Sequence, residues 1–394
     1  MEFVYSEAGP ASKSKTLLFL GENLERESHT GEFLKLAEIY FSRVYAWNIN
    51  EEYKLSVGDP INDIHNALNK FNINVVIFAL GESFLFNPRE LYTLIKKSEK
   101  VKFIFSFSDS EHAFETCDKY YAQLSDLVWI PSPGMKPRFE MFQLAVTVGQ
   151  VFDFELYSSF LKEDHSKKID ISFIGGVYRS DRSLLLETIL ENGYKIYIAG
   201  TGTKNGRLGI SEKNSAIRDS KIHLNFCGVV SNTGGIDNRY TQFKGRVVES
   251  ILLGTFPVSQ FDPSLYEIFG DELIYFYDST DMVNAISIGL KIIDDEPERI
   301  DRLREICFHY FDPERIFHEL ATKKRLKLFR TCLVDGDFKK RYFNEHLYLI
   351  GFFLSQFRVS RVYSEFFKIL FHFCPSLSNI RSFLRGVRDG FFKK

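Results

Sequence analysis

The sequence predicts an α/β protein with two parallel-sheet lobes that face a cleft, followed by a C-terminal helical tail. The length of 394 residues exceeds one ordinary hydrophobic core. Short apolar runs alternate with helical patterns in two separate stretches, and residues 133–167 read as a connection between them. We therefore expect four parts: a polar lead at 1–15, a first lobe at 16–150, a second lobe at 168–330 and the tail at 338–394.

The first lobe alternates strand and helix from its start. Helical patterns lie around 31–41 and at 61–71 and 88–99, and the last opens with Pro88, a residue favoured at the first helical position. Continuous apolar runs are typical of parallel strands that are buried on both faces. The runs predicted to be strands are 16–21, 43–49, 74–80, 101–109 and 126–132.

The second lobe repeats this order after residue 167. Helices are expected at 180–193, 211–220 and 242–254, and three more helical stretches follow to about residue 330. Because parallel sheets bind ligands beyond the carboxyl ends of their strands, two such lobes imply a binding cleft between them. The predicted strands are 170–176, 195–200, 221–226, 255–260 and 273–278.

Composition excludes several classes of protein. A formal net charge of −2 argues against a nucleic-acid binder that acts through overall positive charge. The five cysteines are scattered, with no CxxC pair, which suits reduced thiols better than disulfides or a zinc site. The first residues lack the apolar run of a signal peptide, and no stretch of 18 apolar residues can span a bilayer. We expect a cytoplasmic protein.

The first ligand-binding motif ends the opening strand of the second lobe. Gly175 and Gly176 let backbone amides approach a ligand, and the helix beginning near Ser180 offers its positive end to a phosphate. Arg179 or Arg182 would add a charge-assisted contact. The structural alternative is a tight turn with surface arginines.

A second glycine-rich segment, 197–206, contains Gly200, Thr201, Gly202 and Gly206. This spacing is one residue off the dinucleotide-binding fingerprint. No helical pattern begins at the third glycine, and no acidic residue closes the next strand, so we reject a dinucleotide site. The remaining interpretations are a loop that cradles part of a nucleotide and a simple glycine-rich turn.

The strongest motif spans 221–260, where a strand, a Gly-Gly loop, a cationic helix start and a buried strand follow one another. Lys244 and Arg246 are predicted in the first turns of the helix, where they would bind a diphosphate. Glu249, one turn deeper on the same face, can accept both hydroxyls of a ribose. The alternative is a surface ion pair between Arg246 and Glu249.

Residues 170–290 resemble the C-terminal domain of CgeB-like glycosyltransferases, a GT-B group related to the broad group 1 transferases. The resemblance rests on FIGG (173–176), SKIHLNF (220–226), RVVESILLGTFPV (246–258) and YFYDSTDMVNAI (275–286). It implies a GT-B fold, with Glu249 at the donor ribose and nearby basic residues at the diphosphate. Many retaining relatives carry a second glutamate eight positions earlier, where this chain has Thr241.

The segment from Tyr240 to Val258 also looks like the donor motif of α1,3-fucosyltransferases, in which Lys244 would be the phosphate-binding lysine. On either resemblance the chain is an enzyme that transfers a sugar from a nucleotide-sugar donor. We expect no metal or other cofactor, because cationic side chains and a helix dipole can neutralise the diphosphate instead. The only DxD triplet, Asp335–Asp337, reads as a turn. The predicted donor-binding residues are Gly175, Gly176, Arg182, Gly200, Thr201, Gly202, Asn225, Gly234, Gly235, Lys244, Arg246 and Glu249.

The first lobe is expected to bind a saccharide or lipid-linked acceptor and to supply a general base. Asp109, Glu111 and His112 follow its fourth strand and are the catalytic candidates. The alternative is that Asp109 or Ser110 caps a helix while Glu111 and His112 are solvated. The alternatives in other classes are a sugar-nucleotide epimerase or hydrolase on the same fold and a non-catalytic glycan-assembly protein.

The tail has a composition of its own. Residues 338–394 hold eleven Lys and Arg against three acids, a net charge of +8, together with fifteen Phe and Tyr. Short basic and aromatic helices of this kind lie in anionic membrane interfaces, so we expect peripheral contact with the inner face of a membrane. The alternative is packing against the two lobes.

Overall fold

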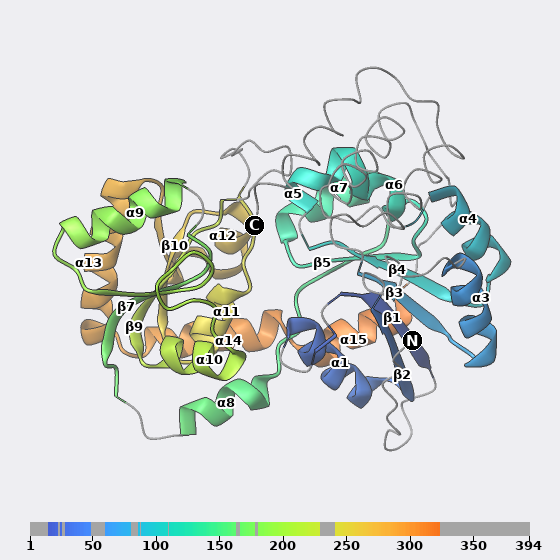
Figure 1. Ribbon diagram of the computed structural model, residues 1–394, viewed down its shortest axis with the longest axis horizontal. Coiled ribbons are helices and arrows are strands. Elements are labelled where there is room, and N and C mark those ends of the chain that lie inside the picture. The colour runs from blue at the N-terminus through green and yellow to red at the C-terminus, as the bar shows by residue number, and fades with distance from the viewer. Residues whose placement is uncertain are drawn as a thin grey trace, which may run out of the picture.

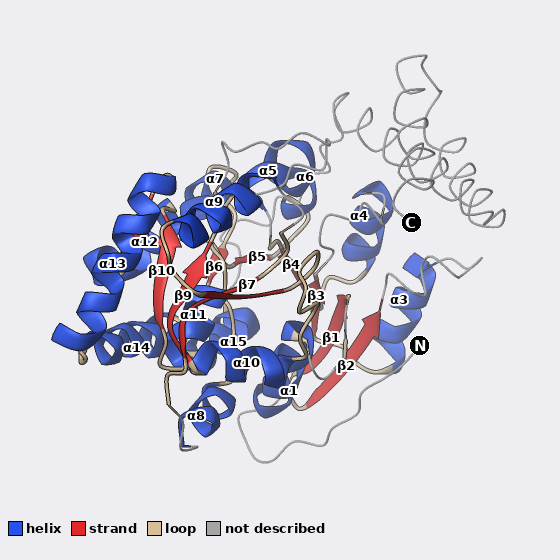
Figure 2. Cartoon of the chain, turned by 60° about the vertical axis from the view of Figure 1, so that its left-hand side comes forward, coloured by secondary structure: helices blue, strands red, loops and turns tan. Residues whose placement is uncertain are grey.

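The computed structural model shows two lobes side by side, each a sheet with helices on both faces (Figures 1 and 2). The expectations for the lead and for the tail at 338–394 fall outside the described residues. The structure describes residues 15–22, 24–25, 28–48, 60–79, 86, 88–108, 110–162, 166–177, 180–228 and 241–323.

The first lobe is built on a six-stranded parallel sheet in the order β2-β1-β3-β4-β5-β6. Its strands are β1 (Thr16–Gly21), β2 (Arg43–Asn48), β3 (Val75–Phe78), β4 (Lys102–Ser106), β5 (Leu127–Ile130) and β6 (Val146–Val148). Its helices are α1 (His29–Tyr40), α3 (Pro60–Lys70), α4 (Pro88–Lys97), α5 (Ser110–Ala113), α6 (Lys119–Ala122) and α7 (Lys136–Glu140), with a π-helical turn at Phe114–Asp118. One face of the sheet packs on α3, α4 and the segment from α5 to α7.

The second lobe has a five-stranded parallel sheet in the order β11-β10-β9-β7-β8. Its strands are β7 (Ile169–Ile174), β8 (Ile196–Ala199), β9 (Ser220–Asn225), β10 (Phe256–Gln260) and β11 (Ile274–Phe276). Its helices are α9 (Ser180–Glu191), α10 (Ile210–Arg218), α11 (Arg246–Leu252), α12 (Pro263–Phe269), α13 (Ser279–Asp295) and α14 (Arg299–Tyr310). The strand order reverses between β7 and β9, the place where such sheets form a ligand crevice. The predicted two-lobed parallel fold is confirmed.

Two local expectations were wrong. The connection at 133–167 contains α7, the edge strand β6 and α8 (Phe154–Lys162). Strand β6 has only three residues, Val146–Val148, which are too few to show a pattern. No prediction covered the segment between β10 and β11, where α12 starts at Pro263 and is capped by the Asp262 carboxylate. The helix expected over 242–254 covers only Arg246–Leu252. Before it, Thr241 forms an antiparallel bridge with Gly228.

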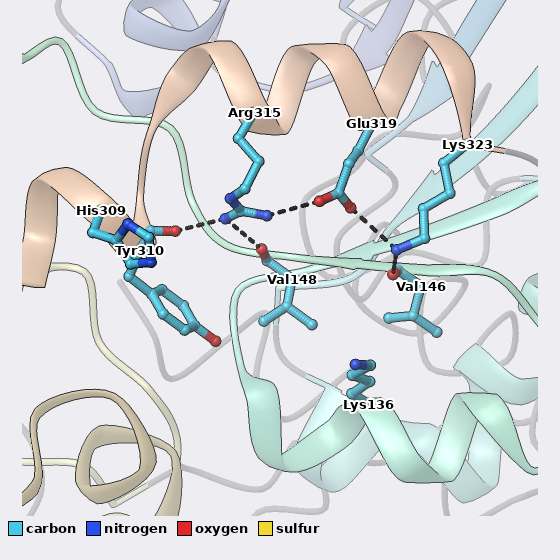
Figure 3. A pocket seen from close by; sticks show the side chains of 8 residues that line it. All are labelled: Lys136, Val146, Val148, His309, Tyr310, Arg315, Glu319 and Lys323. Atoms are coloured by element: carbon cyan, nitrogen blue, oxygen red, sulfur yellow. Dashed lines mark hydrogen bonds and ion pairs between the residues drawn. The ribbon is translucent and has the colours of Figure 1, made fainter.

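The last described helix, α15 (Pro313–Thr322), crosses from the second lobe back to the first and lies beside α1 (Figure 1). Its apolar face joins the core on the second face of the first sheet. Its polar face covers the open edge of β6: Arg315 donates to the Val148 carbonyl at 3.3 Å and Lys323 to the Val146 carbonyl at 2.6 Å (Figure 3). These contacts satisfy acceptors that an open sheet edge would leave free.

Candidate functional site between the two lobes

A cavity of about 430 Å³ lies between the lobes. From the first lobe it is lined by residues at the carboxyl ends of the strands, including Trp129 on β5, and by His29 and Phe33 on α1. The second lobe adds the segment 242–245, which leads into α11. The cavity therefore lies at the carboxyl ends of the first sheet, where a parallel sheet is expected to bind ligands. Gly175, Arg246 and Glu249 do not line it.

Glu249 lies on α11 and is only 2% exposed, although it carries a carboxylate. Lys213 Nζ on α10 donates to Oε1 at 2.7 Å, and the Tyr157 hydroxyl on α8 donates to the same oxygen at 3.4 Å. His29 Nε2, from the first lobe, lies 3.4 Å from Oε1. These contacts converge on one oxygen, and no described residue donates a hydrogen bond to Oε2.

The surroundings of Glu249 keep it ionised. Burial alone would raise the pKa of this carboxyl, but the positive charges of Lys213, His29 and Arg246 and the Lys213 hydrogen bond lower it from 4.5 to about 2. Burial and the neighbouring Glu249 charge raise the pKa of Tyr157 well above its ordinary value, so the phenol stays a donor. The sequence predicted Glu249, but it did not predict the contacts of Glu249 with Lys213, Tyr157 and His29.

Arg246 lies against the end of β7. A Cβ added to Gly175 would stand 2.8 Å from Arg246 Nη1, and one added to Gly200 would stand 2.3 Å from the Gly175 carbonyl oxygen. The absence of a side chain at Gly175 therefore leaves space for the Arg246 guanidinium, and its absence at Gly200 lets the two glycine turns approach each other closely. The Gly175 amide itself donates to the Ala199 carbonyl at 2.8 Å, and the Gly200 amide to the Gly206 carbonyl at 2.6 Å.

The loop after β8 is closed on itself. Gly200 and Gly202 have positive φ angles of 128° and 84°, which a side chain would strain. The Thr201 carbonyl accepts from the Val177 amide at 3.0 Å, and its hydroxyl accepts from Arg207 Nε at 3.0 Å. The loop thus packs against the glycine turn of β7, and together they form one edge of the crevice.

Arg182 connects the two chain segments at the topological switch point. Its guanidinium donates to the Gly176 carbonyl at 3.1 Å and to the Gly228 carbonyl at 3.3 Å, and the residue is 8% exposed. Arg182 thus fixes the turns that follow β7 and β9. Its predicted contact with the donor stays a prediction.

Lys244 precedes α11 and lines the cavity, where its ammonium donates to the Gln242 side-chain oxygen. Gln242 in turn donates to the Ser108 carbonyl of the first lobe at 2.6 Å. The lysine is thus held at the boundary between the lobes, with its charge beside the cavity.

Asn225 is fully buried at the end of β9, and its amide nitrogen donates to the Ser259 hydroxyl at 2.8 Å. His223, on the same side of β9, is also fully buried, and its Nδ1 lies 2.9 Å from the Ser172 hydroxyl. Burial and the charge of Arg246 lower the pKa of His223 to about 3, so this imidazole is neutral. His223 was not predicted as a site residue, since a histidine in an apolar strand resembles an ordinary core residue.

The predicted general bases are not gathered at the cavity. Glu111 lies on α5 and is not among the described residues that line the cavity. Asp109 and the side chain of His112 lie outside the described residues, as do Gly234 and Gly235. The structure therefore brings together Gly175, Arg246 and Glu249, with Lys244 at the cavity wall.

In the described part of the chain, no group of three or more His, Cys, Asp or Glu side chains is arranged to hold a metal ion. The expected independence from a metal stays a prediction. None of the described helices is both long and apolar enough to cross a membrane.

Two all-parallel sheets facing a cleft define a protein of the GT-B fold. The chain is similar to HepE of Anabaena, solved with UDP-glucose, at a TM-score of 0.53 and 11% identity over 78% of this chain and 98% of HepE. It is also similar to sucrose-phosphate synthase of Thermosynechococcus elongatus, at a TM-score of 0.50 and 9% identity over 78% and 98% of the two chains. No protein-family model and no curated protein sequence matches the chain.

Proposed function

We propose that this protein is a glycosyltransferase that moves a sugar from a nucleotide-sugar donor to a saccharide or lipid-linked acceptor. The observation that carries the proposal is the buried, ionised Glu249, whose Oε2 accepts no hydrogen bond from any described residue. An oxygen of this kind, on a carboxylate whose side chain is otherwise buried, suits a ribose hydroxyl, a neutral donor. The structural likeness to HepE, which was solved with UDP-glucose, supports the same donor class.

Two cations next to this carboxylate suit the rest of the donor. The Arg246 guanidinium lies at the crevice end of β7, and Lys244 lines the cavity. In the reaction, an acceptor hydroxyl attacks the anomeric carbon while the bond from that carbon to the diphosphate oxygen breaks. The two cations would then stabilise the negative charge that develops on the leaving diphosphate. Since α11 has only seven residues, we assign this role to the side chains and not to the helix dipole.

The cavity also suits a sugar acceptor. Its first-lobe wall combines the aromatic rings of Phe19, Phe33 and Trp129 with the hydroxyls of Ser106 and Ser108. Aromatic faces and hydroxyls bind the apolar and polar sides of a pyranose. We include in this proposal the resemblance to CgeB-like transferases and a site of action at the inner face of a membrane, reached through 338–394.

The test is to incubate the protein with a panel of nucleotide sugars and to measure nucleotide release with and without added oligosaccharide acceptors. A transferase releases nucleotide faster when its acceptor is present, and Glu249→Gln raises the KM for the donor about tenfold or more. Release that is independent of every acceptor would indicate a hydrolase or epimerase. Absence of nucleotide binding would contradict the proposal and would favour a non-catalytic protein.

A further inference from the structure

Glu249 receives contacts from both lobes. We propose that His29 and Lys213 are positioning residues for this carboxylate, so that capture of the donor by the second lobe depends on a histidine of the first lobe. The inference rests on the proposed role of Glu249 at the donor ribose. It adds that the binding site is complete only while the two lobes are together.

Lys213 fixes the carboxylate from within the second lobe. Its ammonium, 19% exposed, makes the shortest contact of Glu249, at 2.7 Å. Tyr157 approaches the same oxygen from α8. Because Lys213 and Tyr157 both donate to Oε1, they fix the orientation of the carboxylate and therefore the position of Oε2. A fixed acceptor loses less rotamer entropy when a hydroxyl binds to it.

His29 adds the contact from the first lobe. It is the first residue of α1, next to the N-cap Ser28, whose hydroxyl accepts from the Gly31 amide at 2.9 Å. Glu32, one turn later, lies 3.7 Å from His29 Nδ1, and its Oε1 accepts from the Asp153 amide at 2.5 Å. The ring is therefore held between two carboxylates, Glu32 on its own helix and Glu249 across the cleft.

The charges that face His29 favour its protonated form. The Glu32 contact and the charge of Glu249 raise the pKa of the imidazole, while burial and Lys213 oppose the rise. Three further groups face this junction. Tyr157 stays neutral, Arg246 adds positive charge near Glu249, and Asp153, beside Glu32, is paired with Lys35. As the pH rises through the elevated pKa of His29, the imidazolium loses its proton and the cross-lobe attraction weakens. His29 also lines the cavity between the lobes.

Two explanations compete for His29: a structural contact that steadies the lobes, and a contact that prepares Glu249 for the donor. Only the second makes the effect of His29 on nucleotide affinity depend on the Glu249 carboxylate. A double-mutant cycle of His29→Gln and Glu249→Gln separates the two, because the effects of residues that act through one another are not additive.

The experiment titrates the full chain with UDP and with GDP by calorimetry, from about pH 6 to about pH 9, a range that spans the titration of a histidine. The variants are His29→Gln, Lys213→Met, Lys213→Arg, Glu249→Gln and the double variant. His318→Gln, at an exposed histidine on α15, is the matched control. Thermal unfolding without nucleotide reports any loss of folding.

At low pH we expect His29→Gln to weaken nucleotide affinity about 5- to 10-fold, an ordinary size for a coupling between sites. This loss should shrink as the pH rises and vanish in the Glu249→Gln background. Lys213→Met should weaken affinity at every pH, and Lys213→Arg should restore much of it. The control should match the wild type.

The wild type alone keeps the inference testable if a variant does not fold, because its nucleotide affinity must fall as His29 loses its proton. A pH-independent wild-type affinity, or a His29→Gln effect that persists without the Glu249 carboxylate, overturns the inference and leaves the proposed function standing. A wild type that binds no nucleotide overturns the proposed function itself.

Discussion

At the scale of single residues, a carboxylate kept charged inside the protein needs an explanation. Moving a charge out of water is costly unless partners compensate for the lost hydration. Lys213, His29 and Arg246 provide this compensation for Glu249, and the depressed pKa of its carboxyl is the result. Such strongly shifted groups in a cleft are concentrated at functional sites.

The first prediction concerns the pH dependence of stability. The Glu249 carboxyl has a pKa of about 2 in the folded chain and an ordinary value of 4.5. Its charge therefore stabilises the fold above pH 4.5, and that stabilisation is lost as the pH falls towards 2. Near neutral pH, Glu249→Gln should lower the free energy of unfolding by about 3 kcal/mol. Urea titrations should show this difference narrowing below about pH 4.5, and a difference that stays constant would contradict it.

The second prediction concerns the glycine turns beside Arg246. Gly200→Ala places a methyl group against the Gly175 backbone at a φ of 128°, and should cost about 2–3 kcal/mol. Gly206→Ala is the matched control, because its φ is also positive, 64°, but nothing lies within 4 Å of the added Cβ. It should cost about 1 kcal/mol. Chemical denaturation of both variants gives the comparison, and equal losses would show that contact with Gly175 does not matter.

At the scale of elements, α15 and the edge strand β6 depend on each other. Lys102, buried at the start of β4, donates to the Leu320 carbonyl at 2.6 Å and to the Glu319 carbonyl at 3.3 Å. Lys15 donates to the Ala321 carbonyl at 2.6 Å. The last turn of α15 thus has its free carbonyls capped by lysines of the first lobe, as helix C-termini favour.

The third prediction tests this cap. Lys102→Met removes two hydrogen bonds from a buried ammonium and should destabilise the protein by about 1–3 kcal/mol. Hydrogen exchange should increase along α15 first. Lys100→Met, at an exposed position in the turn before β4, should change stability by less than about 0.5 kcal/mol. Unchanged exchange in α15 would show that the apolar face alone holds the helix.

Periodicity located most elements, since the apolar runs at β1, β3, β4, β7 and β9 are long enough to show strand character. It failed at β6, whose three residues carry no pattern, and at the start of α11, which begins at Arg246 after a bridge between Gly228 and Thr241. At the site, Glu249 and Arg246 stand in one recognisable segment. His29 lies far from Glu249 in the sequence. Its role becomes visible only in the folded chain, where it lies next to Glu249 and near Lys213.

At the scale of the whole molecule, a few polar contacts join the lobes outside the cavity. The Ser132 hydroxyl after β5 lies 2.8 Å from the Ser264 hydroxyl on α12, and the Gly134 amide donates to the latter at 3.1 Å. Both serines are buried. The two lobes are therefore in direct polar contact at this point.

The fourth prediction uses this contact as a lock. A Ser132→Cys, Ser264→Cys double variant should form a disulfide when oxidised and hold the lobes together. If donor exchange requires the lobes to separate, turnover should fall at least about tenfold and return when the bond is reduced. Each single cysteine variant under the same oxidant is the control. Full turnover with the bond formed would show that exchange proceeds without separation.

The return of α15 to the first lobe has a consequence for biosynthesis. The core of that lobe uses Ile316, Phe317 and Leu320, which the ribosome adds only after the entire second sheet has been made. Although domains generally fold in order from the N-terminus, the N-terminal half of this chain must wait, incomplete, for its final helix. A chain truncated before residue 313 should therefore remain bound to chaperones, because its first lobe lacks the apolar face of α15.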